Sequence, residues 1–191
     1  MTPGDRRLLE AMTARALVLY RQHGAVQPFG AVETDSGVAI YATNGLPDIE
    51  SKRSLMNAMR LASFDMPGNR SALCFEGWAV VADTPESRSI MERLRSEGRS
   101  ISEHPDVIDA LHVMVESEDG STTRTVAIAR CTEGITLMPP TDEYQPGPSR
   151  NTGDLTGYHV TTGMRRDREF CAYIDMVRFV IEREHEGQLA N

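Results

Sequence analysis

The sequence has 191 residues, of which 40% are hydrophobic and 25% charged, the balance of a globular protein with a core of its own. Its formal net charge of -8 gives an acidic surface that repels phosphates, so we expect neither a nucleic-acid partner nor binding to anionic lipid. No run approaches the roughly 18 apolar residues of a membrane span, so we expect no membrane insertion.

The first third of the chain predicts a helix, a hairpin and a second helix. Apolar residues recur at helical spacing over about 5–22, and Gly24 is placed to end that helix. Two β-prone runs within 25–42 are separated by an Asp-Ser-Gly turn, which is typical of a hairpin. A helix over about 49–64 follows, with Asp48 as its N-cap.

The middle of the chain predicts three strands and a surface helix. The run 72–82 is apolar on both parities, which indicates a strand covered on both faces and therefore central in its sheet. Thr84 and Pro85 are typical of a helix start, and that helix continues to about Glu97. The stretch 107–130 contains two alternating runs around an Asp-Gly turn, so it predicts a second hairpin.

The end of the chain is expected to be a linker and a terminal helix appended to the core. A short strand over 134–138 precedes 139–153, where prolines, glycines and small polar residues predict a linker. A helix over about 167–185 ends the chain, and its strong apolar stripe must pack on the core or on a second subunit. We therefore expect a core domain at 1–140 and a linker plus helix at 141–191.

Hairpins outnumber the places where a parallel crossover fits. The sequence therefore predicts an α+β fold with a mainly antiparallel or mixed sheet of about five strands, flanked by helices.

The segment Ser102-Glu-His-Pro-Asp106 is the densest polar cluster and stands just before a predicted strand. Glu103 or Asp106 would orient or charge His104, making the imidazole a general base near neutral pH. The alternative is that Pro105 forms a turn and the cluster satisfies backbone groups there. Because a strand entry lies outside the core, we expect His104→Ala to leave folding intact.

A second candidate site, for ligand binding, depends on strand pairing. If the strands 72–82 and 107–117 pair, Glu76 and Trp78 lie near His112 and form a patch of acid, indole and imidazole. The alternatives are a hydrogen-bonded histidine on a partly covered face and a tryptophan in the core.

Other familiar chemistry is missing from the pattern. The five histidines contain no H-x-x-x-H or H-E-x-x-H pair, so we expect no metal. The sequence also contains no phosphate-binding glycine loop, so we expect no cofactor. The three cysteines are odd in number and widely spaced, which favours reduced thiols in a cytoplasmic protein. The N-terminus lacks the apolar run of a signal peptide.

Several stretches together resemble a family of small uncharacterised bacterial proteins. They are Gln27-Pro-Phe-Gly, Ala79-Val-Val-Ala, Ser102-Glu-His-Pro-Asp, Asp109-Ala-Leu and Glu116-Ser-Glu-Asp-Gly. The resemblance covers roughly residues 5–130 and implies a protein of unknown function, with no enzyme class behind it.

Two functions remain open at this point. The first is a non-catalytic binding or interaction module that forms a homodimer, another homo-oligomer or a complex with a protein partner. The second is a small-molecule enzyme, such as a hydrolase, that uses His104 with Glu103 or Asp106.

Overall fold

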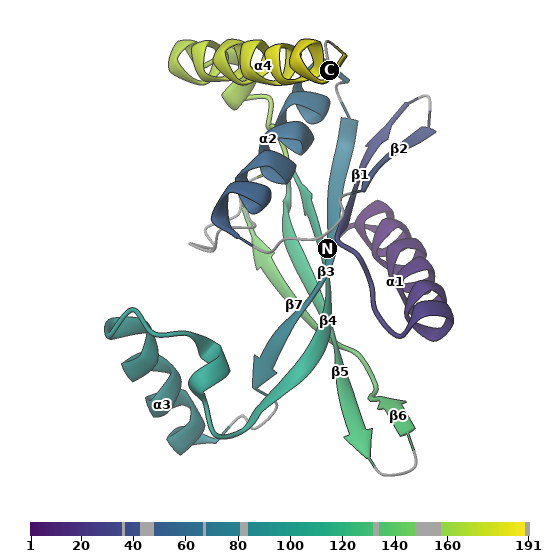
Figure 1. The fold of residues 1–191 in the computed structure, drawn as a ribbon, viewed down its shortest axis with the longest axis vertical. Coiled ribbons are helices and arrows are strands. Elements are labelled where there is room, and N and C mark those ends of the chain that lie inside the picture. Colours follow the sequence, from purple (N-terminus) through teal and green to yellow (C-terminus); the bar gives the residue numbers. More distant parts are fainter. Residues whose placement is uncertain are drawn as a thin grey trace.

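The computed structural model is an α+β fold with four helices and a curled antiparallel sheet (Figure 1). The residues that it describes are 1–35, 37–42, 48–66, 68–80, 84–131, 134–147 and 158–189. The strands are β1 (Phe29–Thr34), β2 (Gly37–Ala42), β3 (Gly68–Val80), β4 (Val107–Ser117), β5 (Gly120–Cys131), β6 (Gly134–Leu137) and β7 (Thr141–Pro146). The helices are α1 (Pro3–His23), α2 (Ile49–Asp65), α3 (Pro85–Ser96) and α4 (Arg168–Leu189), with short 3-10 turns at Ile101–Glu103 and Met164–Arg166.

The helix ends follow from local sequence. Thr2 and Asp5 form a capping box at the start of α1, and Gly24 ends that helix with a left-handed φ of 71°. Thr84 caps α3, whose first residue is Pro85, as the sequence predicts. These boundaries are therefore encoded within a few residues of each helix end.

The sheet has the strand order β2-β1-β3-β4-β5-β6, so β3 is central, as its apolar faces predict. Figure 1 shows α1 on one side of the sheet and α2 and α3 on the other. The face under α1 carries the larger core, which includes Leu9, Met12, Phe29, Cys74 and Val113. The opposite face packs against α2 through a second core of Leu55, Met56, Met59, Leu73, Met114 and Tyr158.

The stretch expected to be a linker contains a strand. Residues 141–146 form β7, which pairs antiparallel with β5 in register from Gly120 opposite Pro146 to Thr125 opposite Thr141. Arg124 donates to both carboxylate oxygens of Asp142 at 2.6 and 2.7 Å. An edge strand held by main-chain bonds and a bidentate ion pair needs little apolar sequence, so the composition did not reveal it. The rest of the expected linker, from residue 148 to 153, lies outside the described residues.

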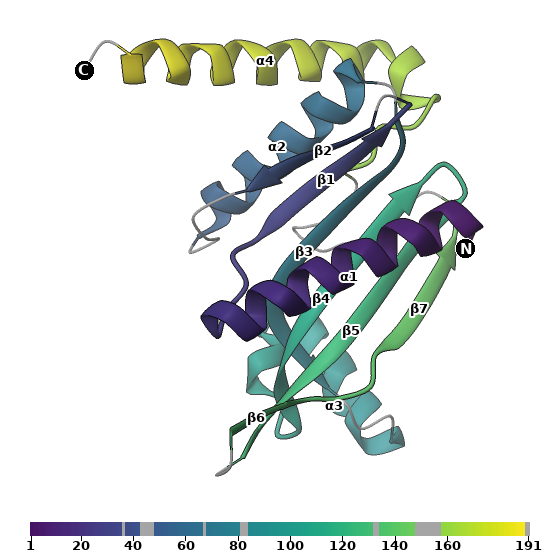
Figure 2. The same ribbon diagram turned by 90° about the vertical axis from the view of Figure 1, so that its right-hand side faces the viewer.

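The terminal helix packs on the end of α2. Phe170 lies against Phe64 with ring centroids 6.4 Å apart, and the Tyr173 hydroxyl donates to Asn57 Oδ1 at 2.5 Å. Figure 2 shows that α2 and α4 meet where α2 ends and α4 begins, and that they diverge from there. The first turns of α4 therefore pack on α2, one of the two places that the sequence left open.

A charged network joins α1 to the sheet. Arg70 on β3 donates from Nε to Asp5 at 2.9 Å and from Nη1 to Glu33 at 2.7 Å. Asp5 is buried, which raises its pKa, but bonds from Thr2 and Arg70 more than offset this and lower the pKa below its ordinary value. The buried carboxylate is therefore tolerated because these groups surround it.

Replacement of Arg70 by methionine tests this network. We expect Arg70→Met to lower the free energy of unfolding by about 3 kcal/mol, because it leaves the buried Asp5 without its cation and near Glu33. Urea denaturation measures the loss. The double variant Asp5→Asn/Arg70→Met should recover part of it, and a loss below about 1 kcal/mol would mean that the pairs act as exposed ones.

Candidate functional site

The most exposed apolar strand in the described part of the chain is β2, at the edge of the sheet. It pairs with β1 in unbroken register from Thr34 opposite Gly37 to Phe29 opposite Ala42, and no described strand pairs with its other edge. Val38 and Ile40 are 49% and 47% exposed and lie on the same face of the strand. An edge of this kind presents unpaired main-chain donors and acceptors beside apolar side chains.

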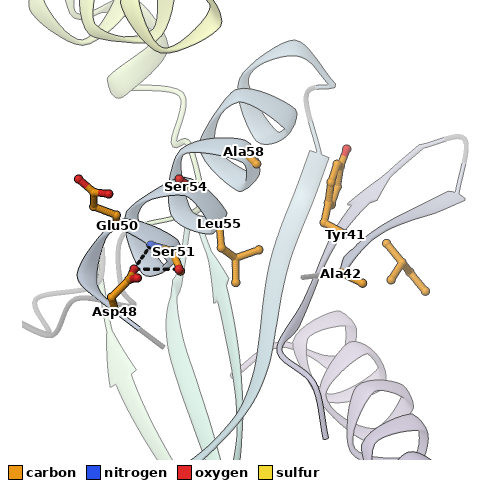
Figure 3. Close-up of a pocket in the computed structure, with 9 residues that line it drawn as sticks. Tyr41, Ala42, Asp48, Glu50, Ser51, Ser54, Leu55 and Ala58 are labelled. Carbon is orange, nitrogen blue, oxygen red and sulfur yellow. Dashed lines mark hydrogen bonds between the residues drawn. The ribbon is translucent and has the colours of Figure 1, made fainter. Parts of the chain in front are cut away.

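A cleft of about 750 Å³ lies between β2 and the first half of α2 (Figure 3). The lining combines apolar and small side chains with acidic and hydroxyl groups, namely Ile40, Tyr41, Ala42, Asp48, Glu50, Ser51, Ser54, Leu55 and Ala58. β2 therefore has both an open edge and a neighbouring cavity.

The acidic end of the cleft is the N-terminus of α2. Asp48 accepts hydrogen bonds from the backbone N–H and the hydroxyl of Ser51 at 2.7 and 2.8 Å, the cap that the sequence predicts. The bonds from Ser51 hold the pKa of Asp48 below its ordinary value. Burial, and then the charge of Asp65, raises the pKa of Tyr41. The cleft thus holds a fixed negative charge at one end and a neutral phenol on its strand side.

His104, expected at a solvent-accessible strand entry, is instead buried, with 2% of its surface exposed. The N–H of Asp106 donates to Nδ1 at 3.0 Å, so Nε2 carries the proton. Nε2 lies 3.2 Å from Ser87 Oγ and 3.3 Å from Ser87 O, which ties the entry of β4 to α3. The expectation that His104 lies outside the core was therefore wrong, since the ring fills the space beneath α3.

The acids beside His104 do not face its ring. Glu103 is bonded to Arg99 on the surface and caps the turn through Ser100 N. Asp106 contacts the imidazole through its backbone N–H. The three residues form a turn that fastens β4, which matches the alternative that the sequence left open for this segment.

The strands that carry the second candidate site do pair, but the register separates its residues. Phe75 lies opposite His112, and their rings stack at 5.2 Å, whereas Glu76 and Trp78 lie on the other face of the sheet. Glu76 accepts from the backbone N–H of Val26, and Trp78 is half exposed. The expected patch of Glu76, Trp78 and His112 is therefore wrong, because neighbouring positions of paired strands alternate between faces.

His112 is bonded within the sheet. Its Nε2 donates to Trp78 O at 3.2 Å, and its Nδ1 lies 3.3 Å from Thr125 Oγ1. Burial lowers the pKa of His112, although the bond to Trp78 O opposes that shift. The imidazole therefore stays neutral and links three adjacent strands.

A buried polar cluster that sequence reasoning missed fastens residues 158–160 to the sheet. Glu116 Oε2 accepts from the backbone N–H groups of Tyr158 and His159 at 2.9 and 3.0 Å. Ser71, directly opposite Glu116 in the sheet, lies 3.2 Å from Nδ1 of His159 through its hydroxyl. The signal in the sequence was that Glu116 shares one face of β4 with apolar residues. The residues that donate to Glu116 lie more than forty positions further along the chain.

This cluster is an anchor and not a catalytic triad. Oε2 of Glu116 accepts from two backbone N–H groups, and all three side chains are buried, so the cluster offers no exposed nucleophile. Burial lowers the pKa of His159 to about 4, against an opposing effect of Glu118, while Arg165 and Arg70 lower it further. His159 is therefore neutral in the folded protein at pH 7.

Comparisons of this chain with family models, with curated proteins and with solved structures found no match. The resemblance to small bacterial proteins therefore stays a prediction. Across the described ranges, no three metal-ligating side chains come together. No described helix is long and apolar enough to cross a membrane.

Truncation of His104 measures its structural role. We expect His104→Ala to lower the free energy of unfolding by about 2–4 kcal/mol, because it opens a cavity and leaves Asp106 N–H unpaired. The matched control is Glu103→Ala, which breaks only exposed contacts and should leave the free energy of unfolding nearly unchanged. Equal losses for the two variants would contradict the buried role.

The depressed pKa of His159 predicts a pH dependence of stability. The unfolded pKa near 6.5 exceeds the folded pKa of about 4, so protons bind the unfolded chain more tightly. The contribution of neutral His159 to the free energy of unfolding is fully present above about pH 6.5. The free energy of unfolding should fall by about 3 kcal/mol as the pH drops toward 4. Denaturation from pH 7 to 4, compared with His159→Asn, isolates this contribution; parallel curves for the two proteins would refute it.

Proposed function

We propose that this protein is a non-catalytic interaction module that binds an extended polypeptide segment by adding it as a strand to β2. The observation that carries the proposal is the unprotected edge of β2. Its sequence, Gly-Val-Ala-Ile-Tyr-Ala, contains no charge and no proline, and its register with β1 has no bulge. Charged residues, prolines and bulges are the features by which proteins usually block strand addition, and β2 has none of them.

The edge strand β7 provides a contrast within the same sheet. It carries Asp142, Glu143 and Pro146, so charge and a missing donor protect it. The exposed side chains of β2 include the apolar Val38 and Ile40, whereas those of β7 include charged residues. The difference supports β2 over β7 as the docking strand.

The cleft specifies the chemistry of the bound segment. In strand addition, main-chain bonds supply affinity and pockets for alternate side chains supply specificity. One set of side chains would face the cleft beside Tyr41, Leu55 and Ala58, and the other would lie on the opposite face of the strand, beside Val38. Asp48 and Glu50 favour a basic residue at one end. We therefore propose a partner segment that is extended, rich in apolar side chains and positively charged at an end.

The enzymatic alternative, with His104 and Glu103 or Asp106, ranks lower. Both ring nitrogens of His104 are bonded within the protein, and the side chain is buried beneath α3. A general base needs a path to the substrate proton, which this arrangement does not supply.

We also propose that the protein acts in the cytoplasm of a bacterium and does not bind nucleic acid. Cys74 and Cys171 are unpaired thiols among the described residues, which suits a reducing compartment. Burial, and then the charge of Glu76, raises the pKa of Cys74 far above its ordinary value, so this thiol is unreactive. The net charge of -8 opposes phosphate binding.

A synthetic peptide tests the proposal. The probe is a short peptide of alternating valine and threonine with a lysine at each end, titrated into isotope-labelled protein while backbone amide signals are recorded. We expect signals of β2 and the first half of α2 to shift. Ile40→Lys, at an exposed position, should weaken binding at least about tenfold, or about 1.4 kcal/mol.

The matched control is Val18→Lys on α1, at 48% exposure against 47% for Ile40. It should bind the peptide as the unaltered protein does. Unchanged β2 signals at about 1 mM peptide would overturn the proposal, and so would equal binding by the Ile40→Lys variant.

A further inference from the structure

The outer face of α4 carries the two most exposed large apolar side chains in the described part of the chain. Met176 and Phe179 are 57% and 58% exposed, and Val180 beside them is also uncovered. With Ala172 they form a stripe at helical spacing on the face that points away from α2. The buried stripe of Ile174 and Val177 lies on the other side of the same helix.

The position of α4 leaves this face open. The helix is attached to α2 through Phe170 and Tyr173 in its first turns and then runs past it (Figure 2). The burial of Ile174 and Val177 sets the rotation of α4 about its axis, and Arg178 adds an exposed ion pair to Asp65 at the end of α2. The uncovered stripe is therefore held in a defined orientation.

Charges along α4 favour a second copy of the same helix as the occupant. Asp175 and Arg183 lie four residues before and after Phe179. In an antiparallel pair centred on Phe179, Asp175 of each copy therefore lies opposite Arg183 of the other. Arg183 already lies over the Phe179 ring at 5.2 Å, beside the seam that such a pair would form.

We propose that the protein forms a twofold symmetric dimer in which the outer faces of two α4 helices pack antiparallel, centred on Phe179. The pair buries Met176, Phe179 and Val180 and joins Asp175 to Arg183 twice. A lipid surface fits the patch less well, since it adjoins Asp175 and the protein carries a net charge of -8. This interface is separate from the β2 edge, so a dimer presents two peptide-binding strands.

Sedimentation equilibrium on the full chain over a range of concentrations tests the dimer. We expect the mass to rise from 21.2 kDa toward twice that value, with weak affinity because one helix of each copy takes part. Phe179→Glu should raise the dissociation constant at least about tenfold, whereas Val18→Glu, an exposed apolar position on α1, should leave it unchanged. Circular dichroism checks that each variant is folded.

Charge reversal tests the antiparallel register. Asp175→Arg and Arg183→Asp should each weaken the dimer, because like charges then face each other, and the double variant should restore it. A protein that stays monomeric at about 1 mM overturns the proposal. A dimer unaffected by Phe179→Glu, or single losses that the double variant does not reverse, also overturn it. The Ile40→Lys variant should still dimerise, which separates this interface from peptide binding.

Discussion

The pairing of β3 with β4 is the constraint on which the remaining structure depends. The two strands pair over eleven residues, from Arg70 opposite Ser117 to Val80 opposite Val107, and both are covered on two faces. One register therefore decides which side chains meet α1 and which meet α2. A shift by one residue would exchange the two faces and bury Glu76 where Phe75 now packs, at a cost of several kcal/mol.

The same register explains why polar groups inside the sheet are structural. It places Ser71 opposite Glu116, where Glu116 accepts from the backbone N–H groups of Tyr158 and His159 and the Ser71 hydroxyl lies beside the His159 ring. Arg165 then donates to Ser63 O and Phe64 O at the end of α2. The chain consequently reaches α4 from a fixed point, so the place where the terminal helix begins traces back to a buried carboxylate on β4.

Local signals predicted the elements well. Thr84, Pro85 and Gly24 act within a turn of their own positions, and the apolar run of β3 revealed a central strand by itself. The candidate site residues were harder, because their role depends on register. Sequence spacing placed Glu76 and His112 together, but the alternation of paired strands put them on opposite faces. The partners of Glu116 depend on a contact across more than forty residues, which no local pattern encodes.

The buried histidines and the exposed apolar surfaces occupy different parts of the molecule. His104, His112 and His159 are bonded inside the sheet or beneath a helix, where truncation costs stability. Ile40 and Phe179 contribute little to either core because about half of each side chain is in water. Exposed β-branched and aromatic side chains on an edge strand and a terminal helix lower the solubility of a protein, and the fold does not require them to be apolar. The two proposed associations would bury both surfaces without altering the registers that hold the sheet.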